Sequence, residues 1–314
     1  MSTRQTVTNW KTHSSGGGLR RGRCFTTGIQ ISRNMTLRRL LFRTAVRFLE
    51  SLVMAAPSPR KLNLDKVAKV DICTVAFNNL DLIHYQHRLL KKFVQDDFQH
   101  VIIDNSTDNG KSEAIYGFCL AEGISYVKVP RNLLNVVGVS YSHATAVNYF
   151  YRRILKKRNP DVFVILDHDM FPIKPVKISS YLENQPFYGP IRRRGKAWYP
   201  TAILNIFDYK WTLVAGRFDF MPVAVDGNYL DTGGGNWFPY YSKMDTNSLT
   251  FPTDELEQFR EGDCYHGDYF EFLDNRIWLH TINGSCWKKT ANGKQRYIHS
   301  YMEQVLGETS DSIC

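Results

Sequence analysis

A regular alternation of strand and helix patterns between Val70 and Leu166 constrains the fold of this chain more than any other feature. Short apolar runs typical of buried strands are separated by longer segments with apolar residues at helical spacing. Strands are predicted at 70–76, 100–104, 124–129 and 162–166, and helices at 80–94, 109–122 and 140–157. This order predicts an α/β fold with a mostly parallel, Rossmann-like central sheet flanked by helices. Ligands of such sheets bind beyond the carboxyl ends of the strands.

After Pro172 the pattern is less regular. It predicts strands at 202–207 and 276–281, a helix at 254–260 and a glycine loop at 233–235. No linker rich in proline and glycine separates this part from the first, so we expect one domain over 66–308, with halves at 66–172 and 173–308. An apolar share of 43% excludes a wholly disordered chain.

The basic charge of the chain lies in its first 49 residues, which hold ten Lys or Arg and no Asp or Glu. Thirty basic and thirty acidic residues remain from Glu50 onward, so the folded part gives no sign of nucleic-acid binding. We expect residues 1–34 to be a disordered basic leader and 35–56 an amphipathic basic helix. The helix falls short of a membrane span. It could lie on an anionic membrane surface, belong to a transit peptide, pack on the domain, or precede the true start at Met35 or Met54.

The six cysteines include no C-x-x-C pair, so we interpret them as reduced thiols. A glycosylation triplet begins at Asn105, beside the ligand site proposed below, where a glycan would obstruct binding. The predicted location is therefore cytoplasmic, with peripheral membrane contact through the basic helix as an alternative.

The strongest chemical signal is Asp167-His168-Asp169, directly after the apolar strand 162–166. Two carboxylates at i and i+2 of an extended chain point to the same side and repel each other unless a cation is near. Carboxylate oxygens suit Mg²⁺ or Mn²⁺, and Mg²⁺ commonly takes one or two carboxylates plus substrate phosphates. The alternative is a strand-end turn with solvated acids. The position of Asp167-His168-Asp169 after three strand-helix units favours a metal site instead.

Between Lys69 and Phe171 the sequence resembles the GT-A glycosyltransferases, particularly the family 2-like enzymes. Three features match in order. Residues 70–79 look like the family's opening strand and its aromatic-Asn turn, and residues 101–109 like its second strand with a D-N-S-x-D ending. Asp167-His168-Asp169 then stands where the family carries its metal-binding D-x-D.

The resemblance implies that the first half of the domain binds a nucleotide-sugar and the second half an acceptor. Phe77 and Asn78 would line the nucleotide pocket, next to Asn105, and Asp104 would hydrogen-bond the base. Asp167 would face the ribose or the metal, and Asp169 would coordinate the metal. Asp104 could instead form an Asx turn before the next helix, and Asn78 could be a simple turn residue.

Ser140-Tyr141-Ser142-His143 opens the third helix, where unpaired N–H groups favour an anion such as phosphate. His143 is a candidate donor contact, and plain N-capping by Ser140 or Ser142 is the alternative. Arg192-Arg193-Arg194 could hold a diphosphate or an acidic glycan, or form a solvated face.

Further candidates lie in the second half of the domain. The glycines at 233–235 could let the backbone approach a ligand, and Trp237 could stack on a sugar. Asp231 and Asp268 are the candidate general bases, with Glu271 as a rival. Many GT-A enzymes supply a late histidine as a metal ligand, and His280 is the candidate, with His299 as the alternative.

These observations predict a metal-dependent glycosyltransferase that uses Mn²⁺ or Mg²⁺. It would move a sugar from a nucleotide-diphosphate donor to a hydroxyl of a glycan, lipid-linked or protein acceptor, with inversion expected from the resemblance. Two alternatives remain. One is a catalytically silent glycan-binding protein of the same fold, and the other is a sugar nucleotidyltransferase, which would normally carry a basic, glycine-rich loop where this chain has Phe77-Asn78-Asn79.

Overall fold

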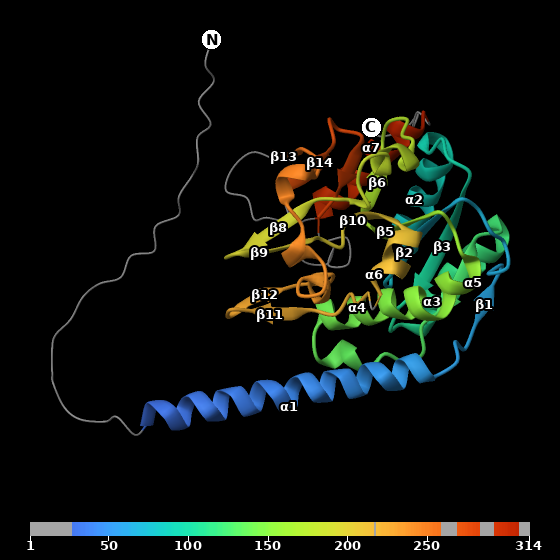
Figure 1. Ribbon diagram of the computed structural model, residues 1–314. Coiled ribbons are helices and arrows are strands. Elements are labelled where there is room, and N and C mark those ends of the chain that lie inside the picture. The colour runs from blue at the N-terminus through green and yellow to red at the C-terminus, as the bar shows by residue number, and fades with distance from the viewer. Residues whose placement is uncertain (1–26, 217, 259–268, 283–291, 308–314) are drawn as a thin grey trace, which may run out of the picture. The chain divides into compact units, whose positions relative to one another are not determined.

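The computed structural model describes residues 27–216, 218–258, 269–282 and 292–307. The chain divides into two units, Met1–Ala45 and Val46–Cys314. The second unit holds every strand of the described residues and is built around a mixed α/β core (Figure 1). Val46 and Val53, in the part of helix α1 that belongs to this unit, are buried.

The helices are α1 (Thr27–Ala55), α2 (Leu80–Phe93), α3 (Asn109–Glu122), α4 (Val139–Tyr149), α5 (Lys156–Arg158), α6 (Tyr209–Ala215) and α7 (Asn292–Leu306). A π-helical segment, Phe150–Leu155, joins α4 to α5. The expected helix at 140–157 is therefore one helical run with a local change of winding. α1 begins at Thr27, inside the stretch expected to be disordered, because a helix already formed adds further residues at little cost.

A seven-stranded central sheet has the order β1-β4-β3-β2-β5-β10-β7. Its strands are β1 (Lys61–Leu62), β2 (Val70–Ala76), β3 (Phe98–Asp104), β4 (Ser125–Lys128), β5 (Val162–Asp167), β7 (Phe187–Tyr188) and β10 (Leu204–Asp208). The four strands of the predicted alternation, β2 to β5, are parallel to one another, whereas β1 and β10 pair antiparallel at either side. The prediction of a mostly parallel sheet flanked by helices is confirmed.

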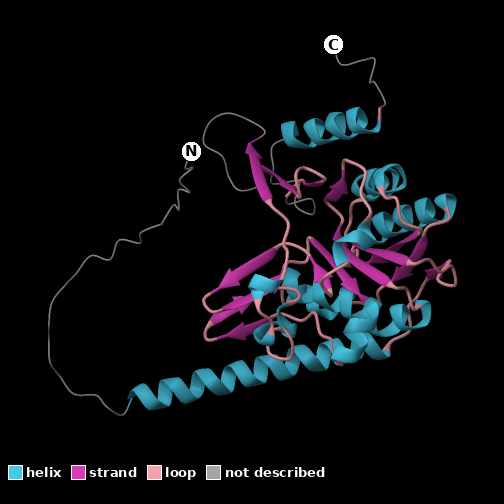
Figure 2. Cartoon of the chain, turned by 45° about the horizontal axis from the view of Figure 1, so that its top comes forward, coloured by secondary structure: helices cyan, strands magenta, loops and turns pink. Residues whose placement is uncertain are grey.

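Three smaller sheets come from the second half of the domain together with β6 (Figure 2). The first has the order β13-β14-β15-β6, and the others are the hairpins β8-β9 and β11-β12. Their strands are β6 (Met170–Pro172), β8 (Ile191–Arg194), β9 (Ala197–Pro200), β11 (Val223–Val225), β12 (Asn228–Leu230), β13 (Asp254–Gln258), β14 (Tyr269–Leu273) and β15 (Trp278–His280). Because β6 follows directly on β5, this sheet joins the late part of the chain to the central strands.

The prediction of a helix at 254–260 is wrong for the residues that the structure describes, because Asp254–Gln258 forms β13. The segment is rich in helix-forming residues, but antiparallel pairing with β14 overrides that preference. Glu255 and Glu257, two residues apart on the strand, both bind the guanidinium of Arg276 at 2.6 Å. Such pairing needs the period of two of a strand and not the period of a helix.

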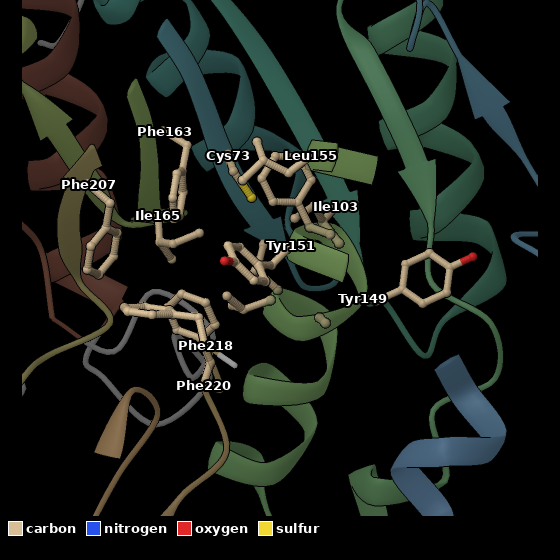
Figure 3. Packing of buried hydrophobic residues seen from close by; sticks show 14 of the residues in the cluster. Cys73, Ile103, Tyr149, Tyr151, Leu155, Phe163, Ile165, Phe207, Phe218 and Phe220 are labelled. Atoms are coloured by element: carbon tan, nitrogen blue, oxygen red, sulfur yellow. The ribbon is translucent and has the colours of Figure 1, made fainter. Parts of the chain in front are cut away.

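The two faces of the central sheet carry different helices. Alternate residues such as Ile103, Phe163 and Ile165 pack in one apolar cluster with residues of α4, whereas Ile102 packs with residues of α2 and α3. Figure 3 shows the first cluster, in which Phe163 and Phe207 stack with ring centroids 5.1 Å apart. Aromatic residues of the second half therefore complete the core on the α4 face.

Cys73 and Cys119 are buried free thiols, as the sequence predicts for these two residues. In the part of the chain described here, no helix combines the length and the apolar character needed to cross a membrane.

Candidate functional site

A cavity of about 660 Å³ opens where β2, β3 and β5 end. Its volume lies within the range of about 300–1,000 Å³ typical of small-molecule sites. The loops after these strands and the first turn of α4 form one part of the wall, and segments of the second half form the rest. The cavity brings together most of the residues selected from the sequence: Phe77, Asn105, His143, Asp167, Asp169, Asp231 and His280.

Asp167 and Asp169 flank His168 in the tight turn that joins β5 to β6, hereafter the acid turn (Asp167–Asp169). The N–H of Asp167 donates to the carbonyl of Ile203 at 3.0 Å, and the carbonyl of Asp169 accepts from the N–H of Thr281 at 2.9 Å. The side chain of Asp169 is only 8% exposed and that of Asp167 is 27% exposed. The acid turn is thus held by backbone on both sides, with one carboxylate largely buried and the other more open.

His280 lies at the end of β15, directly beside the acid turn, because it pairs in register with Met170 of β6. Its Nε2 is 3.5 Å from Oδ1 of Asp169, and its Nδ1 is 2.8 Å from Oε2 of Glu271. Burial alone would lower the pKa of His280, but the two carboxylates outweigh burial and raise its pKa to about 10. The ring therefore carries a proton at neutral pH in the ligand-free protein.

His143 comes from the first turns of α4, and its Nε2 lies 3.2 Å from Oδ1 of Asp167. Burial lowers the pKa of His143, but the carboxylates of Asp167, Asp231 and Asp169 together outweigh it, so the pKa is raised. Three acids from two halves of the chain thus act on one histidine. The cavity concentrates negative charge at one end, which is the electrostatic setting that favours a bound cation.

The donor atoms at this end fit Mg²⁺ or Mn²⁺. Mg²⁺ is commonly held by one or two carboxylates together with substrate phosphates, and Asp167 and Asp169 are carboxylates of this kind. His280 lies beside Asp169, and its Nε2 could serve as a ligand once a bound cation displaces the proton that Asp169 and Glu271 hold on the ring. Among the described residues, no three His, Cys, Asp or Glu side chains converge closely enough to hold a metal by themselves. A cation here would therefore take further ligands from the substrate.

Asp104 does not line the cavity, in contrast to the predicted contact with a base. It is fully buried, and its carboxylate accepts hydrogen bonds from the N–H of Ser106, the hydroxyls of Ser112 and Tyr126, and the ammonium of Lys128. Burial raises the pKa of Asp104, but Lys128 and these donors outweigh it and lower the pKa. The bond from Ser106 gives Asp104 the Asx-type turn of the alternative interpretation, but the side chain that caps α3 is that of Asp108.

Asn78 is also not among the residues that line the cavity. Its backbone φ is 52°, and its side-chain oxygen accepts from the N–H groups of Thr107 and Asp108 at 3.1 and 3.0 Å. Asn78 is therefore the turn residue of the alternative interpretation. Its two hydrogen bonds hold the loop after β3. That loop carries Asn105, which does line the cavity and donates to the hydroxyl of Ser142 on α4 at 2.8 Å.

The first turn of α4 faces the cavity through Ser140, Ser142 and His143. The N-cap is Gly138, and no side chain caps the helix, so N-capping by Ser140 or Ser142 is not observed. An 11-residue helix that begins at a cavity wall offers N–H groups and the positive end of its dipole to an anion.

Asp231 lines the cavity, but the glycine loop that follows it serves packing. A Cβ at Gly234 would meet that of Leu230 at 2.4 Å, and one at Gly235 would meet the carbonyl of Asp219 at 2.7 Å. The glycines therefore allow close approach of the protein's own chain, not of a ligand. Trp237 is likewise a core residue, 8% exposed, with its ring at 77° to that of Trp198.

The remaining candidates lie elsewhere. Asp268 falls outside the described residues. Glu271 contacts the ring of His280 and does not line the cavity. His299 on α7 contacts the hydroxyl of Tyr85 at 3.0 Å and is also not part of the cavity wall. Of the arginine run, Arg192 lines the cavity and is exposed.

Sequence reasoning missed several residues of the wall. Tyr199 and Thr201, from the end of β9 and beyond, line the cavity, and so does Thr232. Their residue types carry no distinctive chemistry, and only the way the second half folds back brings them there. His168, the middle residue of the D-x-D motif, also lines the cavity, and its Nδ1 lies 3.2 Å from the carbonyl of Val75.

No protein-family model and no curated protein sequence matches the chain. Among solved structures, it is similar to the mannosyltransferase PcManGT from Pyrobaculum calidifontis, determined in complex with GDP-Man and Mn²⁺. The match has 15% identity, covers 60% of this chain and 57% of that protein, less than two thirds of its length, and has a TM-score of 0.36. A similarity of this extent is too limited to establish a shared fold or activity.

Proposed function

We propose that the protein is a metal-dependent glycosyltransferase whose donor is a nucleotide-diphosphate sugar. The observation that carries the proposal is the convergence of Asp167, Asp169, His280 and Asp231 on one cavity at the carboxyl ends of parallel strands. Such crevices bind ligands in open α/β sheets, and paired carboxylates suit a cation that accompanies a diphosphate.

Asp169, with Asp167 and His280 beside it, would hold Mn²⁺ or Mg²⁺. When bound, such a cation neutralises charge that develops on a diphosphate leaving group. The first turn of α4, with Ser140 and His143, supports the same anion through its N–H groups and dipole. Phe77 and Asn105, which line the cavity at the ends of β2 and β3, would contact the nucleoside part of the donor.

Asp231 is the general base of this proposal, because it lines the cavity from the second half of the chain. It takes the proton from the acceptor hydroxyl as the hydroxyl oxygen attacks the anomeric carbon. The new glycosidic bond forms while the bond from that carbon to the diphosphate oxygen breaks, and the nucleoside diphosphate leaves with the bonding electron pair. Attack from the face opposite to the leaving group gives inversion.

A thermal-shift panel tests the proposal. UDP, GDP, CDP and ADP are each added with and without Mn²⁺, and one of them should raise the melting temperature strongly only with the metal. A ligand at about 100 times its Kd stabilises the folded state by about 2.7 kcal/mol. Asp169→Asn should abolish the metal-dependent shift.

The matched control is Asp226→Asn, an identical change at an exposed hairpin residue with φ of 48°, a conformation that asparagine tolerates. This variant should keep the full shift. If no diphosphate stabilises the protein under either condition, the transferase proposal fails and a glycan-binding protein becomes the better description. If one diphosphate does stabilise the protein, cleavage of the nucleotide-sugar that contains it tests the assignment of the base. This cleavage should be lost in Asp231→Asn.

A further inference from the structure

A side chain that the proposed chemistry does not use forms hydrogen bonds to the backbone of the acid turn. Gln86 of α2 is fully buried, and its Nε2 donates to the carbonyls of Asp167 and Met170, both at 2.7 Å. These two carbonyls bracket His168 and Asp169. The two hydrogens of one amide group therefore close the turn from both ends.

The two carbonyls also fix the orientation of the Gln86 amide. Carbonyl oxygens only accept, so the NH₂ group must face both of them and Oε1 must face the other way. There Oε1 lies 2.7 Å from Oγ1 of Thr74, whose hydroxyl therefore donates to it. With its proton committed, the Thr74 oxygen is left to accept.

Two buried histidines, His100 and His87, continue this chain of hydrogen bonds. Nε2 of His100 lies 3.1 Å from Oγ1 of Thr74, so it must carry a proton and donate. Nδ1 of neutral His100 is then bare and accepts from Nδ1–H of His87, at 3.2 Å. Every bond from His87 through His100 and Thr74 to Gln86 runs in one direction, set by the carbonyls of the acid turn.

The environment of the histidines agrees with this polarity. Burial is the main cause that lowers the pKa of His87 to about 4 and that of His100 well below its usual value. Both rings are therefore neutral at pH 7, as the bonding pattern requires. The two ring planes lie within 8° of each other with centroids 5.4 Å apart, as expected for two rings joined edge to edge by this hydrogen bond.

We propose that Gln86 is a positioning residue for the acid turn: its amide, which accepts from Thr74 at the end of the His87–His100 chain, holds the backbone that presents Asp167 and Asp169 to the cavity. The inference rests on the proposed function for its consequence in ligand binding, although its structural part does not. Partners of metal-binding groups typically change metal affinity by roughly 10- to 100-fold when they are removed. Gln86 is not part of the cavity wall, so it would act through the backbone of the turn.

The test compares Gln86→Met, which keeps the length of the side chain but lacks both donors, with Thr212→Val. Thr212 is also fully buried and also donates to a backbone carbonyl, that of Tyr209 at 2.8 Å, but it is not part of the cavity wall. The probe is Mn²⁺ together with the diphosphate that most stabilises the parent protein. Gln86→Met should weaken its binding by roughly 10- to 100-fold, and Thr212→Val by less than about twofold.

A second measurement does not depend on the function. Hydrogen exchange followed by mass spectrometry should show faster exchange of peptides that span 167–170 and Thr281 in Gln86→Met, but not in Thr212→Val. Gln86→Asn, which draws the amide back by one methylene, serves if the methionine variant does not fold. Unchanged exchange in a folded variant overturns the positioning role. Faster exchange in a protein that binds no diphosphate would support the positioning role while refuting the proposed function.

Discussion

Acidification from pH 7 to pH 5 should destabilise the domain through His87. Burial, with a further contribution from nearby Lys91, lowers the pKa of His87 from 6.5 to about 4. The unfolded chain therefore binds a proton between these values that the folded domain does not. The stabilisation is fully present above pH 6.5 and is lost as the pH falls toward 4. At pH 5 the loss is about 2 kcal/mol, and it reaches about 3 kcal/mol once both states are protonated.

The assay is urea unfolding at pH 7 and at pH 5. His87→Gln keeps a side-chain N–H donor but does not titrate, so its free energy of unfolding should fall by about 2 kcal/mol less than that of the parent protein. His84→Gln is the control, because His84 lies on the same helix and is exposed. The carboxylates that titrate in this range are common to all three proteins. If His87→Gln loses as much stability between pH 7 and pH 5 as the parent does, the burial of a neutral His87 is not the cause of the loss.

Three further outcomes follow from packing and charge. Arg158→Met leaves the buried carboxylate of Asp71 without the guanidinium that binds it at 2.7 Å. The free energy of unfolding in urea should fall by about 3–5 kcal/mol, and adding Asp71→Asn should restore part of it. Gly235→Ala should cost about 1–3 kcal/mol because its Cβ meets two carbonyls, whereas Gly117→Ala within α3, with nothing inside 4 Å, should be neutral or stabilising by up to about 1 kcal/mol. The basic, acid-free leader and the exposed apolar residues of α1 predict that the full chain sediments with anionic vesicles and not with zwitterionic ones. Leu41→Asp should weaken that sedimentation, and equal binding to both vesicle types would contradict the prediction.

The first half of the domain follows its sequence closely because each of the strands β2 to β5 contains a run of at least three consecutive buried residues. β2 and α3 have the predicted bounds, and the other elements of that half differ by a few residues at their ends. The second half was harder because its elements depend on distant partners. β13 has the composition of a helix, and only pairing with β14 and the ion pairs to Arg276 make it a strand.

The positioning network shows a different limit. Gln86 sits in an amphipathic helix, where a polar residue is expected on the solvent side, yet it is fully buried. The pattern of the sequence carries no sign of the two carbonyls it binds, because backbone groups are the same at every residue. His87 and His100 are equally plain in sequence, since a buried histidine has no spacing rule. Residues that act through backbone are therefore found only from coordinates.

The positions of the two acids that end β3 and β5 follow from the alternation of side chains along each strand, together with the register that places Asp104 beside Ala76 and Asp167 beside Val75 of β2. Side chains alternate across a strand, so Asp104 shares the face of Ile102, and Asp167 shares the face of Phe163 and Ile165. The first face packs on α2 and α3, and Asp104 is accordingly bound by Ser112 of α3. The second packs on α4, and Asp167 lies beside His143 of α4. A D-N-S-x-D ending and a D-x-D ending therefore place their first acids on opposite faces of one sheet, and only the face that carries α4 opens on the cavity.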